Sequence, residues 1–311
     1  MSNSVSPRLL HRARLQVSHR NLAGSERSPW VVLDCDGTLL RPDGSLGERT
    51  CRVIERAQQA GWHVTLATGR RYSTALAIIE RLHLREELVL QNGAVVAQAN
   101  TGGILHYQGV RPEPLAQIIP LGRRYEIDMM LFDDPRRRDG GLIEALPRNL
   151  LDRRYVLENG DLFQKVPDLA EALPDWPLKM IFTAEPDRMK HFVPILKQAI
   201  QPWPDVRMVV YGGSTRPVWS VEILHQQASK AAGVSWVVSR HQASLEQVIA
   251  FGDEMNDYEL ISAAGWGVAM QNGVSELQRV AREIAPPNSQ EGVATVLERL
   301  LEEGGEKELA E

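Results

Sequence analysis

The stretch Trp30-Val-Val-Leu-Asp-Cys-Asp-Gly-Thr-Leu39 carries the strongest indication of the fold. Its first four residues form a continuous apolar run, which is typical of a strand buried on both faces of a parallel sheet. Ligands of open α/β sheets bind beyond the carboxyl ends of the strands, and two carboxylates and a glycine follow there. If this segment is extended, Asp34 and Asp36 can face the same side, and Cys35 points into the core as a small packed hydrophobic residue.

Strands and helices alternate on both sides of this stretch. Apolar spacing predicts a helix that ends near Gly61, and then a strand over 62–67, a helix over 73–84 and a strand over 88–90. Towards the C-terminus it predicts strands over 248–251 and 267–270, a short helix over 257–264, a helix that carries Leu277, Val280, Ala281 and Ile284, and a last helix over 293–300. This order predicts an α/β fold with a doubly wound parallel sheet.

The middle of the chain has a different pattern. Gly-Gly turns, scattered prolines and many charges accompany strand-like pieces over 179–183 and 206–211 and a helix-like piece over 188–200. We therefore predict an inserted α+β domain over 98–222. The core domain is then discontinuous, over 29–97 plus 223–301, and the charged residues 302–311 are expected to form a C-terminal tail.

The composition excludes several classes of protein. The 311 residues include 35 Lys and Arg, 40 Asp and Glu, and two cysteines, for a net charge of −5. The acidity argues against nucleic acid as a partner, the absence of an apolar run of about 20 residues argues against a membrane, and the cysteine count favours a cytoplasmic protein. Residues 1–28 differ, because five arginines and one glutamate are typical of a flexible basic segment or, alternatively, of an organelle import sequence.

Three further motifs lie at predicted strand ends or helix starts. Thr68-Gly69-Arg70 follows the strand over 62–67, where a hydroxyl and free backbone N–H groups can bind phosphate. Ser229 is placed to cap a helix that begins at Lys230, although a lysine there is usually solvated. The acids of Gly252-Asp-Glu-Met-Asn-Asp257 would repel one another, so a divalent cation such as Mg²⁺ is their natural partner. Each motif alone is also compatible with an ordinary turn.

Taken together, the motifs resemble those of the haloacid dehalogenase-like phosphohydrolases, in particular the Cof-type branch, which is similar to sugar phosphatases. The matching segments are Asp34-Cys-Asp36-Gly-Thr-Leu-Leu40, Ala67-Thr-Gly-Arg70, Gln91-Asn92-Gly-Ala94, Lys230, Gly252–Asp257 and Gly267–Asn272. The resemblance covers about 30–301 and implies a Rossmann-like core with a type IIB cap domain inserted after the third strand. Lys179 resembles a residue of a cap strand in that branch.

The resemblance implies a Mg²⁺-dependent phosphatase that hydrolyses a small phosphate monoester, with sugar phosphates favoured, through an aspartyl-phosphate. Asp34 would be the nucleophile and Asp36 the general acid and base. The Asp34 carboxylate, the Asp36 main-chain carbonyl and Asp253 would hold the metal. The implied phosphate-binding residues are Thr68, Gly69, Lys230 and Asn256, with Thr68 and Lys230 also catalytic, and the implied supporting residues are Gly37, Arg70, Asn92 and Asp257.

Two alternatives stay open at this point. A phosphomutase would use the same aspartyl-phosphate but return the phosphate to a sugar. A non-catalytic protein that binds a phosphorylated ligand or acts in regulation would keep the pocket without the chemistry, although the presence of both Asp34 and Asp36 counts against it. Cofactor phosphates such as those of pyridoxal or flavin are second to sugar phosphates as substrates. Side chains of the inserted domain are expected to set specificity, with cationic candidates at Arg123, Arg124, Arg136, Arg137 and Arg138.

Overall fold

The structure is a computed structural model that describes residues 28–136, 139–212 and 217–308. The basic segment predicted over 1–28 lies outside the described residues except for Ser28, and so do Arg137 and Arg138. The chain divides into two compact units, Met1–Leu105 with Lys230–Glu311, and His106–Ser229. Within the described ranges, no helix is both long enough and apolar enough to cross a membrane.

The first unit is built on a five-stranded parallel sheet in the order β14-β13-β12-β1-β2. Its strands are β1 (Trp30–Leu33), β2 (His63–Leu66), β12 (Val248–Gly252), β13 (Trp266–Met270) and β14 (Glu283–Ala285). β1 pairs in parallel with both β12 and β2, and every residue of β1, β12 and β13 is buried. Burial on both faces is the reason that these strands read as continuous apolar runs, and the predicted α/β fold with a parallel sheet is confirmed.

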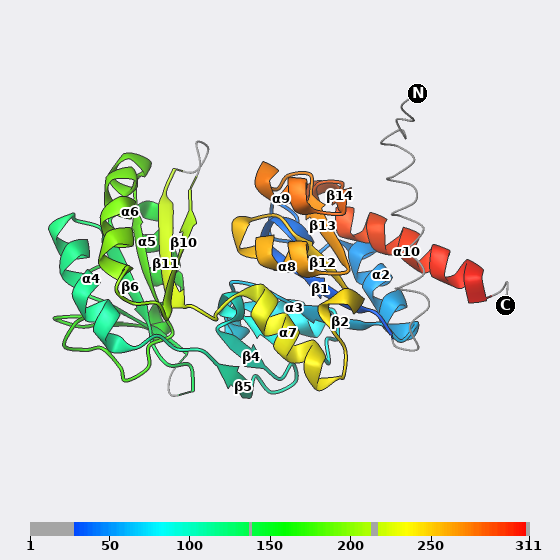
Figure 1. Ribbon diagram of the computed structural model, residues 1–311, viewed down its shortest axis with the longest axis horizontal. Coiled ribbons are helices and arrows are strands. Elements are labelled where there is room, and N and C mark those ends of the chain that lie inside the picture. Colours follow the sequence, from blue (N-terminus) through cyan, green and yellow to red (C-terminus); the bar gives the residue numbers. More distant parts are fainter. Residues whose placement is uncertain (1–27, 137–138, 213–216, 309–311) are drawn as a thin grey trace, which may run out of the picture. The chain divides into compact units, whose positions relative to one another are not determined.

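The sheet continues past β2 through a parallel bridge between Ala67 and Val89. There a second sheet of the same region contains β3 (Leu88–Leu90), β4 (Val95–Ala97) and β5 (Ile104–Tyr107) in that order. The helices are α2 (Glu48–Gln59), α3 (Tyr72–Arg81), α7 (Lys230–Arg240), α8 (Tyr258–Ala263), α9 (Ser275–Val280) and α10 (Gly292–Glu308). Helix α2 packs on α10, and α7 packs on β3 and on α8. In Figure 1, α2 is blue, α10 is red and α7 is yellow.

One predicted element of this unit was wrong. The spacing of Leu277, Val280, Ala281 and Ile284 indicated a single helix, but α9 ends at Val280 and the backbone of Ala281 is extended. The following residues form β14, which pairs in parallel with β13 at the edge of the sheet and leaves Ile284 52% exposed. Pairing with a neighbouring strand therefore overrides the helical spacing. At the C-terminus, α10 continues to Glu308, through most of the segment expected to be a tail.

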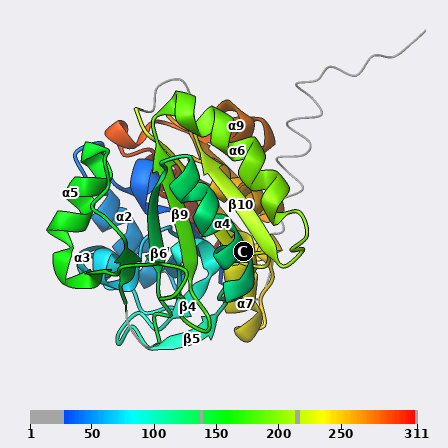
Figure 2. The same cartoon turned by 90° about the vertical axis from the view of Figure 1, so that its left-hand side faces the viewer.

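The second unit is a six-stranded sheet in the order β10-β11-β9-β6-β7-β8. The strands are β6 (Asp128–Phe132), β7 (Gly141–Ile143), β8 (Phe163–Lys165), β9 (Lys179–Ala184), β10 (Val206–Tyr211) and β11 (Trp219–His225). All neighbouring pairs are antiparallel except β7 with β8. The helices are α4 (Pro112–Arg124), α5 (Leu150–Glu158) and α6 (Pro186–Ile200), and α4 and α6 lie together over one face of the sheet (Figure 2).

The boundaries of this unit, at His106 and Ser229, lie slightly later in the chain than the range predicted for the inserted domain. At the beginning, the hairpin of β4 and β5 extends the sheet that starts with β3, so residues up to Leu105 belong to the first unit. At the end, β11 continues to His225 as a partner of β10.

Candidate active site

Three loops that carry the predicted residues lie at one edge of the parallel sheet. Leu33 of β1 pairs with Phe251 of β12 on one side and with Leu66 of β2 on the other. Because all three strands run in the same direction, the residues that follow them emerge together. Asp34 continues the pairing by donating its N–H to the Phe251 carbonyl at 3.1 Å. The three motifs therefore meet although more than 200 residues separate the first from the last.

Lys230 is the centre of the site. It is the first residue of α7 and is completely buried, and its Nζ lies 2.7 Å from Asp34 Oδ1 and 2.6 Å from Asp257 Oδ1. The alternative weighed for this residue, an ordinary solvated lysine, is therefore wrong. Burial by itself would lower the pKa of Lys230, but the two carboxylates outweigh this effect and raise the pKa above its ordinary value. The ammonium thus stays charged and holds Asp34 in place.

The carboxylates around Lys230 outnumber it. Asp34, Asp253 and Asp257 are all buried, and one oxygen from each lies within 4.8 Å of the others. Burial raises the pKa of Asp34 to about 7, against the opposing effect of Lys230, and it raises the pKa of Asp253 to about 8 with the help of the charge on Asp34. One ammonium does not balance three ionised carboxylates. The cluster then has a net negative charge, which a bound cation would neutralise.

The oxygens of the cluster differ in what they already bind. Asp257 uses both of its oxygens, because Oδ1 accepts from Lys230 and Oδ2 accepts from the backbone N–H groups of Asp253 and Glu254. Asp253 Oδ1 accepts from the Thr38 hydroxyl at 2.9 Å. Asp34 and Asp253 therefore have carboxylate lone pairs left over. Hard anionic oxygens of this kind are the ligands that Mg²⁺ prefers, and the residues present fit that ion.

The turn after β1 differs from its prediction. Cys35–Leu39 forms a tight turn rather than a continuous extended segment, because Gly37 has φ +79° although Asp36 before it is extended. Asp36 pairs with Arg70, whose Nε and Nη2 donate to its two oxygens at 2.8 and 2.6 Å. Strict strand alternation does not extend through the whole turn, and the expectation that Asp34 and Asp36 face the same side stays a prediction.

Gly37 is needed at this turn for two reasons. Its φ is in the left-handed region that favours glycine, and an added Cβ would lie 2.1 Å from Asp253 Oδ2. Cys35, in contrast, is fully buried, and burial raises the pKa of its thiol to about 12. It therefore stays protonated, in agreement with its reading as a packed hydrophobic residue.

The loop after β2 is held by its own hydrogen bonds. Thr68 is buried, its N–H donates to the Val89 carbonyl at 2.9 Å, and its hydroxyl accepts from the Arg70 N–H at 3.2 Å. Two backbone N–H groups of the Thr68-Gly69-Arg70 motif, those of Thr68 and Arg70, are therefore already hydrogen-bonded. The Thr68 side chain also lies within hydrogen-bond reach of the Cys35 thiol.

Asn92 and Asn256 link two of the loops. The Asn92 N–H donates to the Thr68 carbonyl, and Asn92 Oδ1 accepts from Asn256 Nδ2 at 2.9 Å. An added Cβ on Gly69 would lie 3.2 Å from the same Asn92 oxygen, so these residues are in close contact. Among the described residues, the buried Asn256 Oδ1 has no hydrogen-bond partner. A buried amide oxygen without a donor is costly, and a bound ligand or water would satisfy it.

Three residues of the site were given no role from the sequence, although Thr38 and Asn272 lie within the segments that match the family motifs. Besides Thr38, which bonds Asp253, Asn272 Nδ2 donates to the Gly37 carbonyl at 2.8 Å. Asn288 donates its N–H to Asn272 Oδ1 and its side-chain amide to the Leu40 carbonyl. Both asparagines follow strands of the same parallel sheet. Their position after β13 and β14 is the signal that could have identified them.

Two of the cationic candidates of the second unit, Arg123 and Arg136, already form ion pairs. Arg123 lies 2.6 Å from Asp168 and also bonds Glu144, and Arg136 Nη2 lies 2.6 Å from Asp134 Oδ2. These acids balance the positive charge that a second anionic group of the substrate was expected to meet.

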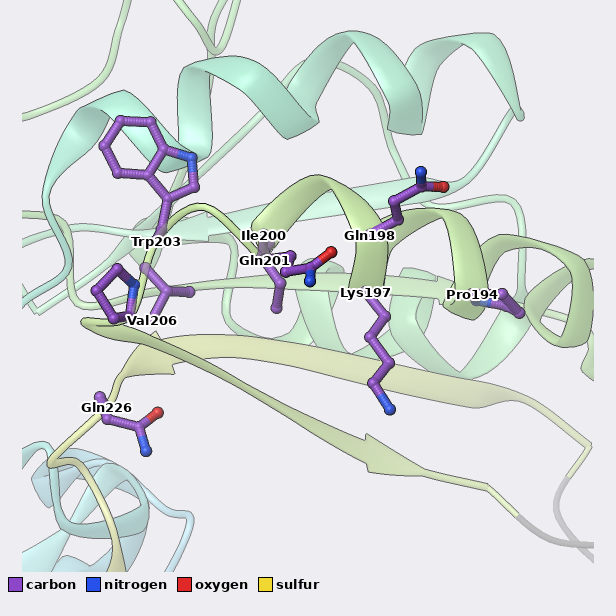
Figure 3. A pocket seen from close by; sticks show the side chains of 9 residues that line it. Pro194, Lys197, Gln198, Ile200, Gln201, Trp203, Val206 and Gln226 are labelled. Atoms are coloured by element: carbon purple, nitrogen blue, oxygen red, sulfur yellow. The ribbon is translucent and has the colours of Figure 1, made fainter.

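The second unit also contains an open pocket of about 590 Å³, shown in Figure 3. Its lining comes from the end of α6 and the start of β10, and it contains Lys197 and Trp203 but none of the residues predicted for catalysis. With a single charged side chain and no carboxylate, this pocket lacks the groups needed for the transfer of phosphate.

Comparison with known proteins gives a consistent result. A sequence profile of the family described as haloacid dehalogenase-like hydrolase matches residues 31–297. The chain is similar to the 5-amino-6-(5-phospho-D-ribitylamino)uracil phosphatase YitU of Bacillus subtilis (strain 168), with 28% identity over 88% of this chain and 97% of YitU. It is also similar to the pyridoxal phosphate phosphatase YbhA of Escherichia coli (strain K12), with 24% identity over 85% of this chain and 95% of YbhA.

A solved structure extends the similarity to the fold. The subclass IIB sugar phosphatase of the haloacid dehalogenase superfamily aligns with a TM-score of 0.69 and 16% identity, over 88% of this chain and 98% of its own. At this identity the similarity concerns the fold alone.

Proposed function

The chain belongs to the haloacid dehalogenase-like hydrolases, and from this we propose that it is a Mg²⁺-dependent phosphatase that acts through an aspartyl-phosphate on Asp34. The family match confirms the resemblance seen in the motifs, with a type IIB fold in the Cof-type branch. The enzyme class is that of a phosphoric monoester hydrolase. The observation that carries the detailed proposal is the contact of Asp34 Oδ1 with the buried Lys230 ammonium at 2.7 Å.

In the first half of the reaction, an oxygen of Asp34 forms a bond to phosphorus and the bond from phosphorus to the ester oxygen breaks. Asp36, when protonated, gives its proton to the departing oxygen, so the alcohol leaves neutral. In the second half, a water oxygen attacks the phosphorus of the aspartyl-phosphate, Asp36 accepts the water's proton, and Asp34 leaves as a carboxylate with inorganic phosphate as product.

Other side chains hold these groups. Lys230 keeps Asp34 in place and stabilises negative charge on the transferring phosphoryl group, and Asp257 orients Lys230 through the contact at 2.6 Å. Arg70 positions Asp36 by binding both of its oxygens. The Thr68 hydroxyl donates to a phosphate oxygen. Asn256 has a second amide hydrogen beyond the one donated to Asn92, and this hydrogen is directed to the phosphate.

The metal belongs to the same proposal. Mg²⁺ held by the carboxylates of Asp34 and Asp253 and by the main-chain carbonyl of Asp36 would reduce the repulsion between an anionic nucleophile and an anionic substrate. The excess of buried carboxylates over Lys230 supports this assignment.

For the substrate, we propose a small phosphorylated metabolite, with sugar phosphates first. The names of two relatives support this proposal, because their substrates are small phosphate monoesters, namely a phosphorylated ribitylaminouracil and pyridoxal phosphate. These two compounds are therefore the second and third members of the substrate panel.

The test measures inorganic phosphate released from the panel by the purified protein with Mg²⁺, before and after treatment with EDTA. Release is expected with Mg²⁺, loss after EDTA, and recovery when Mg²⁺ is added back. Asp34→Asn is expected to reduce release by roughly 10³-fold or more. Asp43→Asn, at an exposed aspartate of the next turn, is the matched control and is expected to keep full activity.

Full activity of Asp34→Asn would refute the nucleophile. Isomerised sugar phosphate without inorganic phosphate would identify a mutase instead of a hydrolase.

A further inference from the structure

A second cluster of ligating side chains lies at the opposite edge of the core sheet from the candidate active site. It contains His63, Glu86, Glu87 and His241, which we call the amino-edge cluster. His63 Nδ1 lies 2.8 Å from Glu86 Oε1, and His241 Nε2 lies 2.8 Å from Glu87 Oε2. Ligand atoms of Glu86, Glu87 and His241 all lie within 4.8 Å of one another.

The topology explains why these residues meet. His63 is the first residue of β2, and Glu86 and Glu87 directly precede β3. These strands are parallel neighbours, so their amino ends lie at one edge. Helix α7 begins at Lys230, at the carboxyl edge, and its last residue is Arg240, so His241 emerges at the amino edge. The carboxyl end of a helix has a partial negative charge that favours a cation.

Trp30 orients both imidazoles. It is the first residue of β1 and is 1% exposed. Its ring stacks on the His63 ring, with centroids 4.6 Å apart and planes 16° apart, and its centroid is 5.0 Å from that of His241. The two imidazoles are 6.0 Å apart. Both imidazoles therefore pack against one buried side chain.

From this geometry we propose that the amino-edge cluster binds one divalent transition-metal ion of the zinc class, separate from the Mg²⁺ site. Two imidazoles and two carboxylates suit Zn²⁺, Co²⁺ or Ni²⁺, whereas Mg²⁺ prefers oxygen ligands alone. Each imidazole would bind the ion in its neutral form, through the ring nitrogen that now faces the glutamate and with its proton on the other ring nitrogen.

The distances require only a small rearrangement. Bonds of about 2.1 Å to a tetrahedral ion place the ligand atoms about 3.4 Å apart. The atoms of each His–Glu pair, now 2.8 Å apart, therefore have to separate by about 0.6 Å, and those of Glu86, Glu87 and His241 that are up to 4.8 Å apart have to approach by up to about 1.4 Å. The side chains are partly exposed, from 17% for Glu87 to 35% for the two histidines, and are free to make this movement. Arg240 Nε, 3.8 Å from Glu87 Oε1, opposes a cation, and we therefore expect binding in the micromolar range.

A bound ion would connect the start of β2, the start of β3 and the end of α7. These segments otherwise join at this edge through the Thr65 hydroxyl, which donates to the Glu87 carbonyl, and through the two His–Glu pairs. The ion would therefore act as a structural link and take no part in the hydrolysis.

The experiment titrates Zn²⁺ into the untagged full-length protein by calorimetry, with millimolar Mg²⁺ present to occupy the carboxylate site. A parallel titration with Co²⁺ follows tryptophan fluorescence, since a paramagnetic ion next to Trp30 quenches it. The variants are His63→Gln and His241→Gln. The matched control is His191→Gln, at a histidine of α6 in the second unit whose Nδ1 lies 2.7 Å from the Asp187 carbonyl.

The wild type and His191→Gln are each expected to bind one Zn²⁺. His63→Gln and His241→Gln are expected to bind it at least tenfold more weakly and to lose the quenching of tryptophan fluorescence by Co²⁺. Zinc affinity in His241→Gln equal to that of the wild type would overturn the proposal, as would a wild type that binds no zinc under these conditions. Circular dichroism establishes that each variant is folded, and His241, at the end of a helix, is the substitution that least disturbs the core.

Discussion

Replacing Lys230 with methionine is expected to destabilise the protein strongly when no metal is present. Methionine has nearly the same length and fills the same space, so the change removes a charge and leaves the packing almost unaltered. In the wild type, the buried Nζ lies 2.7 Å from Asp34 and 2.6 Å from Asp257. The variant leaves a cluster of buried carboxylates without their cation.

The size of the effect follows from burial and distance. At an effective dielectric constant of about 20, two unit charges about 3 Å apart attract each other by roughly 5–6 kcal/mol. The cost of burying the ammonium offsets much of this, and removing one partner of a buried ion pair typically costs about 3–5 kcal/mol. Protonation of Asp34 and Asp253, whose pKa values burial raises to about 7 and about 8, relieves the repulsion below those pH values. The loss is therefore expected to be larger at high pH than at low pH.

The assay is urea denaturation in EDTA, followed by circular dichroism, on either side of this pH range. The matched control is Lys190→Met, because Lys190 forms an exposed pair with Asp187 and such pairs contribute about 0–1 kcal/mol. Added Mg²⁺ is expected to restore part of the lost stability of Lys230→Met. A loss below about 1 kcal/mol at high pH would refute the reasoning, since the buried ammonium would then not be what balances the carboxylates.

Two further changes test the packing around the site. Glu291→Gln removes a carboxylate that accepts from the N–H and hydroxyl of Thr50, in the first turn of α2, at 2.9 and 2.8 Å. Burial opposes ionisation, but these hydrogen bonds outweigh it and lower the pKa of Glu291, so its contribution is present at neutral pH and is lost as the pH falls through that lowered value. We expect a cost of about 1–2 kcal/mol in unfolding free energy at pH 7, and a cost independent of pH would contradict this. Gly233→Ala places a Cβ 2.5 Å from Val89 Cγ1, where α7 packs on β3. We expect it to lower the free energy of unfolding, measured by urea denaturation, by about 1–3 kcal/mol. The control Ser235→Ala, on the exposed face of α7, is expected to leave this free energy unchanged or to raise it.

The strands and the edge that carries the chemistry were predictable from the sequence. A strand buried on both faces of a parallel sheet has to be apolar throughout, and β1 and β12 have that composition. Polar residues that directly follow such strands emerge at one edge. This reasoning brings Asp34 and Asp253 together without any knowledge of the tertiary structure.

Other features were not predictable, because local spacing does not contain them. The turn around Gly37 depends on one positive φ, and the ion pair of Asp36 with Arg70 joins residues of two different loops. Ile284 has helical spacing from Leu277, but β13 offers a free edge, and pairing with that edge makes a strand. A periodicity of a few residues is weaker than a row of backbone hydrogen bonds.

The sequence alone thus determined the α/β fold and the edge of the sheet at which the acidic residues lie. Both follow from apolar runs and from the residues directly after them, which are local properties of the sequence. The burial of Lys230 between Asp34 and Asp257 and the meeting of His63 with His241 became visible only in the folded molecule. Charge interactions and metal coordination depend on distances of a few ångströms between segments far apart in sequence. Those distances are set by how α7 packs across the sheet, from one edge to the other.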